Sequence, residues 1–168
     1  TDGGATYGQV AKLTASDAAR YEYFGISVAI DGGTIVVGAR YDDDGGSMSG
    51  SAYVFRTTDG GATYGQVAKL TASDAAAVDS FGYSVAIDGN TVVVSAIWDD
   101  DVGSDSGAVY VFRTTDGGAT YDELAKLTAS DAAEGDMFGW SVAIDGGTIV
   151  VGTPYDDDAG LTSGSAYV

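Results

Sequence analysis

The stretch SVAIDGGTIVVGARYDDDGGSMSGSAYVF, from Ser27 to Phe55, decides the fold. It contains three apolar segments, and a glycine-rich turn, DGG, separates the first two. An acidic loop with three successive aspartates precedes the third. Short apolar runs rich in β-branched residues and divided by Gly and Asp are typical of strands joined by turns. This stretch therefore predicts three consecutive strands of an antiparallel sheet.

The whole chain repeats this pattern. The sequence TDGGATY begins at Thr1, Thr58 and Thr115, which gives a period of 57 residues. In the first copy we expect four strands, at residues 24–30, 34–39, 51–56 and 63–72, the last being polar as an exposed outer strand should be. Asp-Gly at 31–32 predicts a type I′ hairpin turn between the first two strands. No helical periodicity is present, so the sequence predicts an all-β protein made of β-propeller blades, with three repeats of four antiparallel strands.

The composition limits the chemistry that the chain can perform. Among its 168 residues there is no Cys and no His, which excludes disulfides, thiol chemistry, most zinc sites and a histidine base. The net charge of −18 disfavours contact with nucleic acid or insertion into anionic membranes, and it attracts cations. Because 45% of the residues are hydrophobic, the chain is not a disordered acidic tail.

The repeated segments also resemble a known family. The sequence FGYSVAIDGNTVVVSA at residues 81–96, followed by GAVYVF at 107–112, is similar to the FG-GAP repeat. Phe-Gly recurs at residues 24–25 and 138–139, so the resemblance covers essentially the whole chain. It implies the β-propeller blades of integrin α chains and of many bacterial surface proteins, and hence an extracellular or cell-surface location.

The repeat divides the chain into four parts. Residues 1–23 hold an outer strand that completes a neighbouring blade and the connection that follows it, residues 24–80 and 81–137 are two blades, and residues 138–168 are a third blade without its outer strand. Propellers usually need at least four blades to close. We therefore expect the strand at Ala5–Ala15 to complete the blade at residues 139–168 of another chain, or of another segment of the same parent. A closed ring and an open fibre both remain possible.

One family feature does not carry over to this sequence. Calcium-binding members resemble EF-hands in the turn between the first two strands, where they have a D-x-D-x-D-G-type loop. Here that turn reads only DGG or DGN. One carboxylate cannot supply the six to eight oxygen ligands of Ca²⁺. We therefore interpret Asp31, Asp88 and Asp145 as turn formers.

The antiparallel strand order places the acidic loops on one rim of the blades, together with the connections between blades. The candidate metal ligands are Asp42, Asp43, Asp44, Asp99, Asp100, Asp101, Asp156, Asp157 and Asp158. Clustered carboxylates without His or Cys favour Ca²⁺ or Mg²⁺ over transition metals. A solvated charged loop, or a contact surface for a basic partner or another copy of the chain, would explain the same pattern.

An enzymatic function is disfavoured because the acidic cluster recurs in every repeat, whereas an active site normally occurs once. The lysines of the outer strands, Lys12, Lys69 and Lys126, also recur, and we expect them to pair with nearby aspartates. The sequence thus favours a non-enzymatic structural or adhesive module that assembles with copies of itself or with neighbouring repeats. The alternative is a domain that binds a cell-surface protein or a glycan, with Tyr41, Trp98 and Tyr155 as stacking residues.

Overall fold

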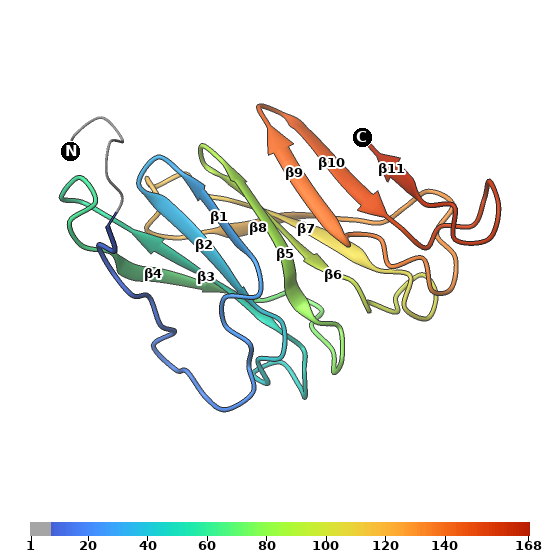
Figure 1. The fold of residues 1–168 in the computed structure, drawn as a ribbon, viewed down its shortest axis with the longest axis horizontal. Helices are drawn as coiled ribbons and strands as arrows, with labels where there is room; N and C mark the ends of the chain where they lie inside the picture. The colour runs from blue at the N-terminus through green and yellow to red at the C-terminus, as the bar shows by residue number, and fades with distance from the viewer. Residues whose placement is uncertain (1–7) are drawn as a thin grey trace.

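The protein folds into three antiparallel β-sheets that follow one another along the chain and lie side by side (Figure 1). The computed structural model describes residues 8–168, and no helix occurs among them. The first sheet contains β1 (Val28–Asp31), β2 (Thr34–Ala39), β3 (Ser51–Arg56) and β4 (Gly65–Leu70). The second contains β5 (Phe81–Asp88), β6 (Thr91–Ala96), β7 (Ala108–Arg113) and β8 (Asp122–Leu127), and the third contains β9 (Ser141–Asp145), β10 (Thr148–Thr153) and β11 (Ser165–Tyr167). The predicted all-β fold of three blades is confirmed.

The middle strands of the first two blades are apolar on both faces. In β2 and β3, Val36 pairs with Val54 and Val37 pairs with Tyr53, and all four side chains are buried. Alternate residues of a strand point to opposite faces of the sheet. Val36 and Val54 therefore pack against the second blade, whereas Val37 and Tyr53 belong to a cluster on the opposite face of the first blade.

The hydrophobic core is divided into layers between the blades. One cluster joins the first and second blades and includes Val54, Phe81 and Val94. Another joins the second and third blades and includes Val93 and Phe138. Stability is thus a property of each pair of adjacent blades, as in other repeat proteins.

The Phe-Gly pair of the repeat is where consecutive blades come closest. The Phe81 ring packs edge-on against Tyr110 and Phe112, with centroid distances of 5.5 and 6.0 Å. Gly82 has a φ of +87°, and a Cβ at this position would lie 2.2 Å from the carbonyl oxygen of Ser51 in the preceding blade. Only glycine allows both the conformation and the contact.

The turn between the first two strands differs from the predicted type. Asp31 pairs with Thr34, so the two central residues are Gly32 and Gly33 rather than Asp31 and Gly32. Of these two, only Gly32 has a positive φ, of +53°. A positive φ at the first central residue alone is the type II′ pattern, so the predicted type I′ turn was wrong.

Two predicted strand boundaries also shift. The first strand begins at Val28 instead of residue 24, whereas the equivalent strand of the second blade begins at Phe81, the counterpart of Phe24. Phe81 pairs with Gly50 of the preceding blade, and no preceding blade borders Phe24 among residues 8–168. The fourth strand is Gly65–Leu70 rather than residues 63–72. The predicted strand at Ala5–Ala15 lies partly outside the described residues, and its described part, 8–15, is not in a strand.

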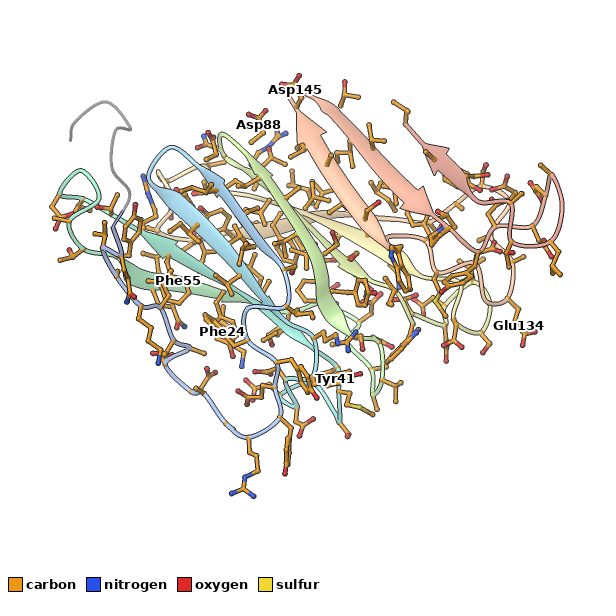
Figure 2. All side chains as sticks on the ribbon, in the orientation of Figure 1. Phe24, Tyr41, Phe55, Asp88, Glu134 and Asp145 are labelled. Atoms are coloured by element: carbon orange, nitrogen blue, oxygen red, sulfur yellow. The ribbon has the colours of Figure 1, made fainter. Side chains whose placement is uncertain are left out.

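The two rims of the blades are chemically different, as the strand order predicts. Figure 2 shows Asp88 and Asp145 at the turns at one end of the sheets, whereas Tyr41 and Glu134 lie towards the opposite end. The DDD loops connect β2 to β3, β6 to β7 and β10 to β11 at this second end.

Candidate functional site

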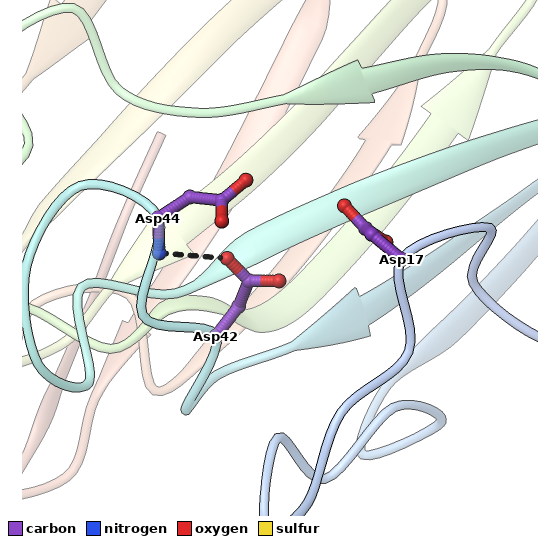
Figure 3. A group of neighbouring side chains, drawn as sticks. All are labelled: Asp17, Asp42 and Asp44. Carbon is purple, nitrogen blue, oxygen red and sulfur yellow. Dashed lines mark hydrogen bonds between the residues drawn. The ribbon is translucent and has the colours of Figure 1, made fainter.

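In the first blade, a single lysine side chain joins three aspartates on the acidic rim. Lys69 lies on β4, and its Nζ is 2.8 Å from Asp17 Oδ2, 3.0 Å from Asp42 Oδ2 and 2.5 Å from Asp44 Oδ2. Asp42 and Asp44 come from the DDD loop, whereas Asp17 belongs to the segment that leads into the blade (Figure 3). The expected pairing of the outer-strand lysine with nearby aspartates is confirmed here.

Asp42 is the centre of this cluster, and its side chain is almost completely buried. Its carboxylate accepts hydrogen bonds from the Ser51 hydroxyl at 3.0 Å, the Tyr53 hydroxyl at 2.7 Å and the Asp44 amide at 3.1 Å, in addition to the ion pair with Lys69. Burying a carboxylate is tolerated only where its oxygens are paired in this way. The donors come from β3 and β4, so the cluster fixes the DDD loop to the outer half of the sheet.

The second blade repeats the same arrangement. Lys126 Nζ lies 2.8 Å from Asp74, 2.8 Å from Asp99 and 2.6 Å from Asp101. The hydroxyl of Tyr110 lies 2.7 Å from Asp74 Oδ1 and 2.8 Å from Asp99 Oδ2, and it donates its single proton to this pair. Residues 57 positions apart therefore have the same roles in both blades.

The third blade contains the tyrosine and the aspartates but no lysine within the described residues. The Tyr167 hydroxyl lies 2.9 Å from Asp131 Oδ1 and 2.6 Å from Asp156 Oδ2. The Asp158 amide donates to Asp156 Oδ1 at 3.1 Å, as its counterparts do in the other blades. In the first two blades the lysine lies on the fourth strand, and the third sheet has three strands within residues 8–168.

The electrostatics of the first cluster favour its charged form. Burial opposes ionisation of Asp42, but hydrogen bonds from Tyr53 and Lys69 outweigh it and hold the pKa of the carboxyl below its ordinary value. Burial likewise opposes the charge of Lys69, yet hydrogen bonds to Asp17 and Asp44 raise its pKa. Burial, together with the hydrogen bond to Asp42, raises the pKa of Tyr53, so this hydroxyl stays protonated and acts as a donor.

The three aspartates of each DDD loop have different environments. The first and third join the lysine cluster, whereas the second does not. Asp43 Oδ1 accepts a hydrogen bond from the Met48 amide at 2.7 Å, and Asp100 Oδ1 accepts one from the Asp105 amide at 2.8 Å. The middle residue thus closes the loop.

The structure adds Asp17, Asp74 and Asp131 to the clusters. They lie in the connections that the strand order placed on this rim, but they were not among the candidate ligands. It also did not identify the tyrosines of the third strands, although Tyr53, Tyr110 and Tyr167 recur at the same spacing as the acidic loops. That shared period is the signal that would have connected them to the cluster.

The cluster has some of the features of a cation site. One carboxylate oxygen from each of Asp17, Asp42 and Asp44 lies within 4.8 Å of the others, and Asp74, Asp99 and Asp101 form a second such group. Oxygen atoms at this spacing suit a hard divalent cation. In both groups, however, a lysine ammonium contacts all three carboxylates, so a metal ion would compete with it for the same oxygens. Metal binding by the nine DDD aspartates stays a prediction.

The aromatic residues that precede the DDD loops pack mainly against other side chains. The Tyr41 ring lies edge-on to Tyr23, and the Arg40 guanidinium sits 4.5 Å from its centroid. Tyr155 packs edge-on against Trp140, with a centroid distance of 5.4 Å. Both Trp140 and Tyr155 keep an exposed side, which makes them the aromatic pair best placed for a ligand.

Comparison with known proteins identifies the repeat. A family model described as the FG-GAP repeat matches residues 7–55, 64–112 and 121–168, which together make up most of the chain. No curated protein matches the chain. Residues 8–168 contain no helix of the length and apolar character needed to cross a membrane. Each match ends with the first three strands of one blade and begins with the segment before them, which is the fourth strand of the preceding blade in the second and third matches. The matches thus follow the period of the blades, and the chain belongs to the FG-GAP repeat family.

Proposed function

We propose that this chain is a non-enzymatic, extracellular structural or adhesive module that works within a larger assembly of blades. The observation that carries this proposal is the difference in burial between equivalent residues of the first two blades. Val28 and Ile30 on β1 are 69% and 65% exposed, whereas Val85 and Ile87, their counterparts on β5, are 7% and 9% exposed. The first blade therefore presents an apolar face that in the second blade is covered by a neighbour.

The third blade presents the matching face at the other end of the chain. Val150 on β10 is 38% exposed, whereas its counterpart Val93 is fully buried against the third blade. Contiguous exposed apolar residues on otherwise acidic proteins mark interaction surfaces. Within the chain, adjacent blades join through a face like that of the third blade and a face like that of the first. The two exposed faces could therefore pack against each other in the same way. The neighbour is a blade of another chain or of another segment of the same parent protein.

Association provides the direct test. The variant with Val28→Ser and Ile30→Ser removes the apolar face of the first blade without disturbing a buried contact. We expect sedimentation velocity to show concentration-dependent association of the unmodified chain and a shift of this variant towards the monomer. Val102→Ser is the matched control, because Val102 is also exposed but lies in the acidic loop of the second blade. Equal association of all three proteins would contradict the proposal.

Ca²⁺ bound to the acidic rim is a second part of this proposal. It is supported by the net charge of −18 and by the close grouping of carboxylates in the first two blades. Added Ca²⁺ should raise the melting temperature, and Asp156→Asn with Asp158→Asn, in the blade without a lysine, should reduce that rise. Asp88→Asn is the control, because Asp88 lies on the opposite rim (Figure 2). A melting temperature that responds to neither Ca²⁺ nor EDTA would exclude this part.

The exposed aromatic residues favour glycan binding as the alternative function. Tyr83, Trp140 and Tyr155 form a continuous row, with centroid distances of 5.2 and 5.4 Å between neighbours. Aromatic rings with one apolar side exposed and one packed are suited to stacking on sugars. A glycan array with the unmodified chain and with Trp140→Ala tests this alternative, and binding that is lost in the variant would support it.

A further inference from the structure

The third blade repeats the contacts between tyrosine and aspartates that adjoin the lysine in the second blade. In the second blade, Tyr110 contacts Asp74 and Asp99, and Lys126 contacts the same two residues. In the third blade the equivalent Tyr167 contacts Asp131 and Asp156 with similar distances. The tyrosine half of the cluster is thus assembled, and the described residues supply no ammonium for it.

The missing cation has an electrostatic consequence. Repulsion from Asp156 and Asp131 raises the pKa of the Asp158 carboxyl above its ordinary value. The equivalent carboxylates of the first two blades lie close together around an ammonium group, within 4.8 Å of one another. Within residues 8–168, the third blade therefore holds mutually repelling carboxylates where the other two blades hold an ammonium group.

The strand beside these carboxylates has an open edge. β3 pairs with β2 on one side and β4 on the other, and β7 likewise pairs with β6 and β8. Within residues 8–168, β11 pairs only with β10. Its free edge offers unpaired backbone groups to an added strand.

The chain itself contains the strand that fits. Residues 8–13 read GQVAKL, which is identical to the sequence of β4. These residues form no strand with the described part of the chain, and Lys12 is exposed and makes no ion pair with residues 8–168. Leu13 packs against the first blade, but the backbone of residues 8–13 and the outer edge of β11 are both without a strand partner within residues 8–168.

We propose that residues 8–13 of a second copy of the chain add to β11 as the fourth strand of the third blade, and that Lys12 of that copy binds Asp131, Asp156 and Asp158. The register follows from the complete blades, where Tyr53 pairs with Lys69 and Tyr110 pairs with Lys126. Lys12 of the second copy accordingly pairs with Tyr167, and Leu13 pairs with Ala166. This proposal rests on the assembly proposed above and specifies its partner and its contacts.

The segment that follows Lys12 already has the conformation this contact needs. In the chain, the amides of Val78, Ser80 and Phe81 donate to carbonyl groups of the preceding DDD loop. Val78 and Ser80 adopt left-handed φ values of 82° and 58° there. The equivalent Tyr21 and Tyr23 have φ values of 74° and 56°, although the described structure contains no blade before them. Their amides can therefore meet the carbonyl groups of residues 161–163 of another copy.

A polar contact between strand and connection supports the same arrangement. The Ser16 amide donates to Gln66 Oε1 at 2.9 Å, and Ser73 donates to Glu123 through its amide and its hydroxyl. In the third blade the equivalent serine is Ser130, and its acceptor is Gln9 of the second copy. Strand addition also brings the exposed faces at Val28 and Val150 together, because one repeat is continued by the next.

The test uses sedimentation equilibrium of the whole chain. Lys12→Met removes the ammonium but keeps the length and apolar stem of the side chain. We expect it to weaken association at least about tenfold, since it removes three charge-assisted contacts. Arg20→Met is the matched control, because it changes the net charge equally in the same segment, and it should associate like the unmodified chain. Equal association of the Lys12→Met variant and the unmodified chain would overturn the proposal.

A peptide experiment locates the acceptor. A fluorescent peptide of residues 5–15 should bind the whole chain, and the same peptide with Lys12→Met should bind at least about tenfold more weakly. Asp158→Asn in the chain should weaken binding, whereas Asp101→Asn, the equivalent change in a blade that holds its own lysine, should not. Equal binding of both peptides would overturn the proposal.

The outcomes separate this inference from the assembly on which it rests. If the chain associates, and only the Val28→Ser and Ile30→Ser changes weaken it, the assembly stands and the lysine contact is wrong. If association requires Ca²⁺ and ignores Lys12, a metal ion occupies the third blade and the lysine contact is again wrong. A chain that stays monomeric and binds no peptide would contradict both.

Discussion

The second and third blades have nearly the same sequence pattern but different surroundings. Val93 and Tyr110 of the second blade are fully buried, whereas their counterparts Val150 and Tyr167 keep exposed surface. The second blade is covered on both faces, and the third is covered on one (Figure 1). The difference teaches that a single repeat does not bury its own apolar residues. The neighbouring blades determine which of these residues are buried and so contribute to stability.

The largest expected effect concerns Gly107, where the adjacent third blade leaves no room for a side chain. A Cβ on Gly107 would lie 2.3 Å from the carbonyl oxygen of Phe138, and φ is +82°. At the equivalent Gly164 φ is +71°, but the nearest atom would be 3.2 Å away. We expect Gly107→Ala to lower the free energy of unfolding by about 4 kcal/mol, from backbone strain and overpacking together, and Gly164→Ala by about 1 kcal/mol, from strain alone.

Urea denaturation at concentrations where the chain is monomeric measures both values. Equal losses in the two variants would mean that the φ angle, and not the adjacent blade, requires glycine at this position. Because the comparison uses the same substitution in the same loop, it isolates the contribution of the neighbour.

The middle of each blade was predictable from the sequence. Strands at residues 34–39 and 51–56 were predicted to the residue, since uninterrupted β-branched and aromatic runs leave few alternatives. The FG-GAP resemblance was also correct, as was the pairing of Lys69 and Lys126 with aspartates. Lys12, for which the same pairing was expected, makes no ion pair within residues 8–168. These features depend on local pattern and on the repeat.

Features that depend on contacts between distant segments were not predictable. The start of the first strand depends on a neighbouring blade, because the equivalent strand of the second blade begins at Phe81, which pairs with Gly50 of the first blade. The burial of Asp42 depends on hydroxyl groups from β3, and the DDD motif by itself reads as a solvated loop. The sequence therefore identified the rim but not the buried carboxylate at its centre.

The next effect in size compares the buried carboxylates of the two blades. Asp99 binds Lys126 and Tyr110, and its removal leaves the ammonium without its most buried partner. We expect Asp99→Asn to lower the free energy of unfolding by about 3 kcal/mol. Asp156→Asn should cost clearly less, because Asp156 contacts no ammonium group within residues 8–168 and the substitution also relieves its repulsion of Asp158.

Chemical denaturation at pH 7 checks these values, and Lys126→Met should be as damaging as Asp99→Asn if the two residues act together. Equal losses from Asp99→Asn and Asp156→Asn would show that the lysine adds nothing to the cluster. The contrast between blades would then come from packing alone.

A smaller effect is expected from the apolar layer between blades. Val93→Ala should lower the free energy of unfolding by about 2 kcal/mol, since it removes two buried carbons and leaves a cavity. Val150→Ala should cost no more than about 0.5 kcal/mol in the monomer, because Val150 is partly exposed there. Thermal denaturation of dilute and of concentrated protein distinguishes the monomer from the assembly. If the loss of stability caused by Val150→Ala grows with protein concentration, this residue lies in the assembly contact.

The smallest effect is a pH dependence from Asp79, which lies in the connection between the first and second blades. Burial, with a smaller contribution from the charge of Asp99, raises the pKa of Asp79 from 3.8 to about 6. Between these values the folded protein holds a proton that the unfolded chain has released, so this residue stabilises the fold as the pH falls and loses that contribution as the pH rises through about 6. Allowing for solvent screening, the free energy of unfolding of the unmodified chain should rise by about 1 kcal/mol relative to that of Asp79→Asn between pH 7.5 and pH 5.

The aspartates of the lysine clusters do not mask this gain, because the pKa values of Asp42 and Asp74 are lowered and both stay ionised above pH 5. Parallel urea titrations of the two proteins measure the difference. A difference that stays constant with pH would mean that the blades on either side of this connection do not enclose the carboxyl.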